Sequence, residues 1–153
     1  MQVLDGSPYD DPMPQTQDPS PLDEAVARVG DRWALLIVQA LLGGTRRFND
    51  LQAELPGIAP NVLSQRLKHL EREAVVVSRP YSRRPPRFAY ELSASGLELA
   101  GALRLLAQWG AERAGGGGAL RHAECGTPME ARWYCPTCAR MVADDEADDL
   151  HYA

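Results

Sequence analysis

The chain has 153 residues, of which 44% are hydrophobic, and a formal net charge of −5, which suits one domain with a small appendage. It contains no run of about 18 apolar residues that would predict a membrane span. It also lacks a basic segment followed by an apolar run, the pattern of a secretory signal, so we expect a cytoplasmic protein with no membrane partner.

The negative charge is confined to the two ends of the chain. Residues 1–21 carry −4 and residues 115–153 carry −4, whereas residues 22–114 carry +3. Within this middle part, a basic cluster faces only Glu71 and Glu73 in the sequence. Its members are Arg66, Lys68, Arg72, Arg79, Arg83, Arg84 and Arg87. A local excess of positive charge of this kind is expected where a protein binds phosphate.

The pattern along the chain divides into five parts. Residues 1–19 carry four prolines among Asp, Gln and Ser without periodicity, and we expect a mobile or loosely docked N-terminal arm. The main domain is predicted over residues 20–114. It is followed by a glycine-rich linker over residues 115–121, a cysteine-containing segment over residues 122–140 and an acidic tail over residues 141–153.

Two helices are expected to open the main domain. The first is Leu22–Val29. The second, Arg32–Leu42, is apolar on nearly all sides, which predicts a central place in the core. A Gly-Gly pair ends it, and a short extended segment then places Arg46 and Arg47 near the start of a third helix, Phe48–Glu54.

A fourth helix, Pro60–Glu73, follows a Pro-Gly turn and sorts its residues by face. Leu63, Leu67 and Leu70 are spaced at i, i+4 and i+7, so they form one apolar stripe for the core. The opposite side carries five polar or basic residues: Asn61, Ser64, Gln65, Lys68 and Arg72. These side chains can bond to base edges and phosphates.

The helical period then changes to an extended one. Ala74–Tyr81 and Arg87–Leu92 are predicted strands, joined by a tip that contains Arg83 and Arg84. This order predicts a winged helix-turn-helix, a mainly α fold with a small β-hairpin wing. The helix Pro60–Glu73 is slim enough for a DNA major groove, and the arginine tip can reach backbone phosphate or the minor groove. We prefer this interpretation to a solvated helix face beside an ordinary basic hairpin.

One long helix is expected from Ala94 to Arg113, with Ser93 as its N-cap. Leu99, Leu103 and Leu106 form one stripe on it, and two further apolar residues, Leu105 and Trp109, widen that stripe. A domain this small rarely covers so much helix surface, so a partner subunit is the preferred cover over a purely intramolecular core. A homodimer would also place two recognition helices about 34 Å apart, in successive major grooves.

All three cysteines lie in the segment after the linker. His122 and Cys125 form one pair with two residues between them, and Cys135 and Cys138 form a second. Two such pairs suit a tetrahedral zinc ion, so we predict a zinc-ribbon-like appendage with structural Zn²⁺. Three unbound thiols, or a disulfide within the second pair, are the alternatives, and neither accounts for the histidine. A redox or metal-sensing role is a further alternative to a structural one.

The main domain resembles the HxlR-type branch of the MarR-related winged-helix regulators. The resemblance covers about residues 20–113 and lies in VGDRWALLIVQALLGGTRRFNDLQAELPGIAPNVLSQRLKHLEREAVV, RPPRFAYELSASG and LRLLAQWG. It implies a homodimer that binds DNA as a transcriptional regulator, with Pro60–Glu73 as the recognition helix and the arginine tip in the wing. Members of this family often carry a sensing cysteine where this chain has Ser20 before Pro21, and a hydroxyl cannot form the thiolate that such chemistry requires.

The expected function is sequence-specific binding of double-stranded DNA by a homodimeric regulator, most simply a repressor. Arginine side chains would contact phosphates, whereas polar side chains of the recognition helix would read bases. The predicted contact residues are Arg46, Arg47, Asn61, Ser64, Gln65, Lys68, Arg72, Arg83 and Arg84. The main alternative is a protein-interaction module that docks a partner protein. An enzyme is not expected, because no nucleophile–base set or open metal position is visible. A crevice between dimer helices would admit a small-molecule effector, which the sequence does not identify.

Overall fold

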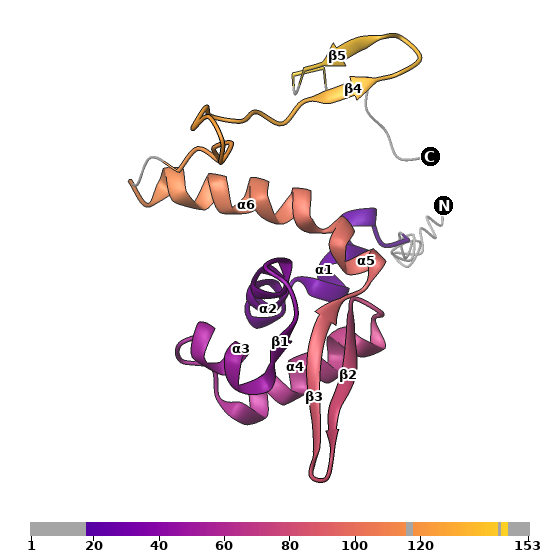
Figure 1. Cartoon of the computed structure of the whole chain (residues 1–153). Coiled ribbons are helices and arrows are strands. Elements are labelled where there is room, and N and C mark those ends of the chain that lie inside the picture. Colours follow the sequence, from indigo (N-terminus) through magenta and orange to yellow (C-terminus); the bar gives the residue numbers. More distant parts are fainter. Residues whose placement is uncertain (1–17, 116–117, 144, 147–153) are drawn as a thin grey trace, which may run out of the picture.

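The computed structural model describes residues 18–115, 118–143 and 145–146. Most of the predicted N-terminal arm and most of the acidic tail lie outside these residues. The elements are, in order, α1 (Pro21–Val29), α2 (Arg32–Leu42), β1 (Arg46–Arg47), α3 (Phe48–Glu54), α4 (Pro60–Arg72), β2 (Val76–Arg83), β3 (Pro86–Leu92), α5 (Ala94–Glu98), α6 (Ala100–Arg113), β4 (Trp133–Cys135) and β5 (Arg140–Val142). The prediction of a mainly α fold with a small β-hairpin wing is confirmed (Figure 1).

Helix α2 lies at the centre of the core, as predicted. Four of its side chains are almost completely buried: Ala34, Ile37, Val38 and Leu41. The leucine stripe of α4 packs against it, and Leu51 of α3 is also fully buried. Because fully burying a leucine or isoleucine side chain is worth about 1.5–3 kcal/mol, these contacts dominate the stability of the main domain.

A three-stranded antiparallel sheet closes one side of this core, in the order β1-β3-β2. The two residues of β1, Arg46 and Arg47, pair with Tyr90 and Ala89 of β3. Strands β2 and β3 form the hairpin, which extends beyond the helices at its turn (Figure 1). The predicted lead-in before α3 is therefore a real strand, and it connects the wing to the start of α3.

The prediction of a single helix from Ala94 to Arg113 is wrong, because the structure has two helices there, α5 and α6, separated at Leu99. The Leu99 backbone N–H bonds to the carbonyl of Gly96 (3.2 Å), a tight three-residue turn that ends α5. Ser93 caps α5 as expected, since its Oγ accepts a hydrogen bond from the Gly96 N–H (3.0 Å). Gly96 itself lies against the Val75 carbonyl, where an added Cβ would come within 2.2 Å of the oxygen.

Helix α6 lies across α2 and carries the C-terminal segment on its other side (Figure 1). Its predicted apolar stripe is divided: Leu99 and Leu103 pack on the core, whereas Leu106 is exposed. The C-terminal segment contributes the short hairpin β4–β5 and an isolated bridge between Arg121 and Pro128. No helix among the described residues is long and apolar enough to cross a bilayer.

Candidate nucleic-acid interface

The burial of α4 determines which of its side chains can contact a ligand. Leu63, Leu67 and Leu70 are fully buried, so the helix has one fixed inner face. Asn61, Gln65, Lys68 and Arg72, all predicted contact residues, are exposed on the outer face, and Ser64 is half-buried beside them. In the part of the chain that the structure describes, none of these five side chains forms a hydrogen bond or ion pair. They remain available to a partner molecule.

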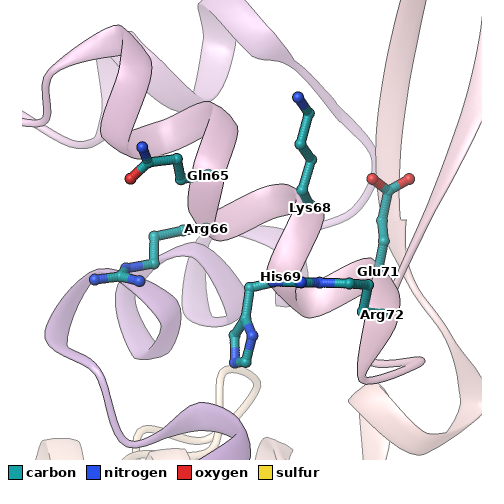
Figure 2. A pocket seen from close by; sticks show the side chains of 6 residues that line it. All are labelled: Gln65, Arg66, Lys68, His69, Glu71 and Arg72. Atoms are coloured by element: carbon teal, nitrogen blue, oxygen red, sulfur yellow. The ribbon is translucent and has the colours of Figure 1, made fainter.

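The outer surface of α4 is open. Six of its side chains line a shallow hollow of about 770 Å³: Gln65, Arg66, Lys68, His69, Glu71 and Arg72. Figure 2 shows these side chains projecting from the one helix in different directions. An open surface of this kind fits an extended partner better than a small ligand, because small-molecule sites are concave and bury most of their ligand.

Two contacts anchor the flank of α4. Arg66 Nε lies 2.8 Å from Asp31 Oδ1, and the same carboxylate caps α2 by accepting hydrogen bonds from two backbone N–H groups. His69 Nε2 lies 2.9 Å from the carbonyl oxygen of Arg28, at the end of α1. These two contacts fix the direction of α4 relative to α1 and α2.

The tip of the wing is basic and exposed. Arg83, Arg84 and Arg87 are all exposed, and the Ser82 hydroxyl donates a hydrogen bond to the Pro85 carbonyl (2.9 Å), which closes the turn. The strand register shifts between Pro80 and Ser82, so one extra residue of β2 bulges out of the ladder. Because a β-bulge changes the direction of a side chain, it can aim the residue at that position out of the sheet.

That extra residue is Tyr81, which the sequence did not indicate as a site residue. The guanidinium of Arg47 lies over its ring, 4.6 Å from the centroid. The two residues border a hollow of about 550 Å³ between the start of α3 and the wing, which Asn49 and Arg87 also line. The sequence signal for Tyr81 as an interface residue was its position as an aromatic residue just before the arginine tip. The β-bulge that sets its direction has no signature in the sequence.

Several predicted basic residues already have acidic partners within the domain. Arg46 Nε lies 2.6 Å from Glu54 Oε1, and its guanidinium also donates to backbone carbonyls of the α2–β1 turn. Arg79 pairs with Glu91 on the adjacent strand. The expectation that only Glu71 and Glu73 would face the basic cluster is therefore wrong, because Asp31 and Glu91 come from distant parts of the chain.

Six basic side chains remain on this side of the main domain. Within the described part of the chain they are exposed and form no ion pair: Arg47, Lys68, Arg72, Arg83, Arg84 and Arg87. They come from the start of α3, from α4 and from the wing, three elements that the sheet and core hold together. This surface can bind phosphate groups through its cations and can read other polar groups through the outer face of α4.

The four predicted zinc ligands form two pairs in the C-terminal segment. Cys125 Sγ lies 3.5 Å from His122 Nδ1 and 3.2 Å from Thr127 Oγ1. Hydrogen bonding with Thr127, first with its side chain and then with its backbone, lowers the pKa of the Cys125 thiol. Hydrogen bonds from the backbone and thiol of Cys138 lower the pKa of Cys135. Among the described residues, no three His, Cys, Asp or Glu side chains gather closely enough to hold a metal ion.

Ser20, at the position where the resembling family often has a cysteine, caps α1. Its hydroxyl donates to Asp23 Oδ2 (2.6 Å) and accepts from the Asp23 backbone N–H (3.1 Å), while the Ser20 N–H also donates to the Asp23 carboxylate (3.0 Å). These hydrogen bonds from Ser20, the side-chain one being the larger contribution, lower the pKa of Asp23. The residue forms a complete capping box and has no sulfur for redox chemistry.

Comparison with known proteins places this surface in a family. The family model described as HxlR-like helix-turn-helix matches residues 28–116. The HTH-type transcriptional regulator Mb3122 of Mycobacterium bovis is 37% identical over 122 residues, which is 77% of this chain and 77% of the relative. The HTH-type transcriptional regulator YvaP of Bacillus subtilis is 40% identical over 90 residues, 59% of this chain and 83% of the relative.

A solved structure shows the same arrangement of elements. PA1374 from Pseudomonas aeruginosa, a protein assigned as a transcription factor, matches with a TM-score of 0.63 and 30% identity over 80% of this chain and 86% of that one. The match of the family model extends over more than half of the chain, and it includes α2, α3, α4 and the wing. The chain belongs to the HxlR-like helix-turn-helix family, and it is a transcriptional regulator, not an enzyme.

Proposed function

We propose that the protein binds specific sites in double-stranded DNA, with α4 in the major groove and the wing on the backbone or in the minor groove. One observation carries the proposal: among the described residues, the outer face of α4 presents polar and basic side chains that form no hydrogen bond or ion pair, and exposed cations without an ion pair flank it on β1 and the wing. The buried leucine stripe fixes that face outward, and an α-helix fits the width of the major groove.

The residues divide by chemistry into two roles. Asn61, Ser64, Gln65 and Lys68 would read base edges, because their amide, hydroxyl and ammonium groups match donors and acceptors in the groove. The exposed arginines would contact phosphates and set the register of the protein on the duplex. For Arg46, the ion pair with Glu54 and the hydrogen bonds to the α2–β1 turn support a structural role beside any contact with DNA.

Homodimerisation is supported by exposed apolar side chains on α1 and on α6. Leu22 and Val26 of α1 are 71% and 56% exposed, and Leu106 and Trp109 of α6 are 51% and 57% exposed. These helices lie at the end of the domain opposite the wing tip, so a second copy could cover them without blocking α4 (Figure 1). Two copies would present two recognition helices to one face of the duplex.

A repressor is the simplest form of such a regulator. A dimer held on DNA by two recognition helices and two wings would occupy the duplex and exclude other proteins from it. Regulation of a neighbouring gene then needs only an operator within or near that gene's promoter. The DNA upstream of the protein's own gene is therefore the first place to look for the operator.

The test compares the purified protein on that upstream DNA and on a random duplex of equal length, at low and at physiological salt. We expect binding to the upstream DNA to persist at physiological salt, whereas binding to the random duplex weakens sharply. Equal binding to both duplexes that is lost with added salt would mean nonspecific attraction only. Salt-resistant binding without duplex preference would point instead to a protein partner.

Two variants separate the proposed roles. Gln65→Ala should change which duplexes are preferred, because a good bidentate base contact is worth about 1–3 kcal/mol of discrimination. Arg84→Ala should weaken binding to all duplexes by a similar factor. If both variants lost affinity equally on the upstream and the random DNA, the division into base-reading and phosphate-binding residues would be wrong.

A further inference from the structure

The C-terminal segment contains two turns with the same backbone plan. In the first, the His122 N–H donates to the carbonyl of Thr127, five residues later (2.9 Å). In the second, Cys135 pairs with Arg140, again five residues later, as the last pair of the β4–β5 ladder. Each turn therefore has one candidate ligand at its first position and another three residues on.

The residue after the second candidate ligand has a left-handed backbone conformation in both turns. Gly126 has φ 70° and Ala139 has φ 53°. This conformation disfavours residues other than glycine, typically by about 1–2 kcal/mol, so its adoption by Ala139 marks a defined turn. The same reversal in both turns brings the two ligand side chains of each pair to one side.

The first pair already has the separation of two zinc ligands. A tetrahedral ion with bonds of about 2.3 Å to sulfur and about 2.0–2.1 Å to nitrogen holds those two atoms about 3.6 Å apart. Cys125 Sγ and His122 Nδ1 are 3.5 Å apart. In the second pair, the backbone and the thiol of Cys138 lie close enough to the sulfur of Cys135 to influence its ionisation, so those two ligand residues are also neighbours.

The segment has no core that would hold it together without a ligand. No residue between 118 and 143 that the structure describes is buried. Its largest apolar side chains, Trp133, Tyr134 and Met141, are 61%, 55% and 57% exposed. A stretch with so little buried apolar surface is typical of small metal-folded units, in which metal binding supplies much of the folding free energy.

We propose that His122, Cys125, Cys135 and Cys138 of one chain together bind one Zn²⁺ ion in a closed tetrahedral site. The two pairs lie apart in this structure, and the connecting residues 127–134 would bend so that the second turn meets the first. Three thiols lose their protons to water on binding, and the histidine binds as neutral imidazole. Four protein ligands leave no open position, so the ion closes the segment and has no catalytic role.

The first turn lies beside α6 of the main domain, so we take it as the anchor of the site. Leu120 and Met129, on either side of that turn, line a hollow of about 210 Å³ against Leu105 and Gln108 of α6. The second turn belongs to the β4–β5 hairpin, which continues the chain away from this contact. Closure on the metal would therefore bring the exposed aromatic residues of β4 back toward α6.

The experiment uses the full chain, freed of metal with a chelator and titrated with Co²⁺ and then with Zn²⁺. We expect one Co²⁺ per chain with the visible and near-ultraviolet bands of a tetrahedral, thiolate-bound ion, and displacement of Co²⁺ by Zn²⁺. Cys135→Ser and His122→Ala should each weaken binding by more than about 100-fold, since even outer-shell partners contribute about 10- to 100-fold. Thr137→Ala, between two ligands in the same turn, should bind like wild type.

Two outcomes would overturn the proposal. One is a spectrum without thiolate bands, or metal binding that the Cys135→Ser variant retains. The other is recovery of binding when a chain lacking the first pair is mixed with a chain lacking the second, which would mean a site shared between chains. DNA binding measured on the same variants, whose winged helix is unchanged, keeps this result separate from the proposed function.

Discussion

Replacing Arg84 with glutamine should make DNA binding less dependent on salt, whereas the same change at Arg79 should not. Both are arginines of the wing: Arg79 lies in β2, and Arg84 lies five residues later in the turn between β2 and β3. They differ in one respect: Arg79 is paired with Glu91, whereas Arg84 is exposed and forms no ion pair within the described residues. The pair is thus a matched test of whether the unpaired cations contact phosphate.

The magnitude follows from counterion release. Each phosphate that a protein neutralises on duplex DNA adds about 0.9 to the slope of log K against log salt concentration. Arg84→Gln should therefore reduce the slope by about 0.9 per bound protomer, or about 1.8 for a dimer on its operator. Arg79→Gln leaves Glu91 without its partner, and any resulting repulsion would lower affinity with a much smaller change in slope.

The assay is fluorescence anisotropy of a labelled duplex over a series of salt concentrations at fixed pH. Wild type and both variants are measured on the upstream DNA and on a random duplex, and circular dichroism confirms that all three proteins are folded. A slope for Arg84→Gln equal to that of wild type would show that the wing tip does not contact phosphate. Equal reductions of the slope for both variants would show that the ion pair with Glu91 does not keep Arg79 from contacting phosphate.

Four further variants test stability and assembly. Gly96→Ala should lower the free energy of unfolding by about 1–3 kcal/mol, because the new Cβ would collide with a carbonyl oxygen 2.2 Å away. Gly101→Ala, with nothing within 4 Å, should raise it by about 0.5–1 kcal/mol, and urea denaturation of the two variants should show opposite signs. In Ser20→Ala, the pKa of Asp23 should rise toward its ordinary value in an NMR titration. Because that pKa is depressed in the folded state, the stabilisation is present above the unfolded pKa and is lost as pH falls through the folded one, so the stability difference from wild type should shrink in acid. Trp109→Lys should shift the protein toward monomer in sedimentation experiments without unfolding it, and an unchanged mass would contradict the proposed α1–α6 interface.

The sequence predicted the elements that depend on local signals. The helices Arg32–Leu42 and Phe48–Glu54 have the predicted bounds. Their apolar periodicity and the glycine or proline residues that end them lie within one short stretch of sequence. The leucine stripe of α4 likewise predicted the buried face, and through it the exposed one. The turns of the C-terminal segment are local in the same way, and each two-residue spacing corresponds to a defined turn.

The errors lie where distant parts of the chain meet. The break at Leu99 goes with the close contact of Gly96 with Val75, some twenty residues earlier in the sequence. Likewise, the acids that neutralise Arg66 and Arg79 come from the start of α2 and from the other wing strand. No period or composition indicates such contacts, so the sequence overstated the basic surface.

The way α4 is held has a consequence for how such a regulator can acquire new targets. The contacts that fix its direction use buried leucines and its flank, through Arg66 and His69. The side chains that face outward, such as Gln65 and Lys68, form no hydrogen bond or ion pair with the rest of the described domain. They can be exchanged at little cost to folding, since surface substitutions away from such contacts usually change stability by less than about 0.5 kcal/mol. Gene duplication could therefore give two copies that dock on DNA in the same pose and respond to different operators.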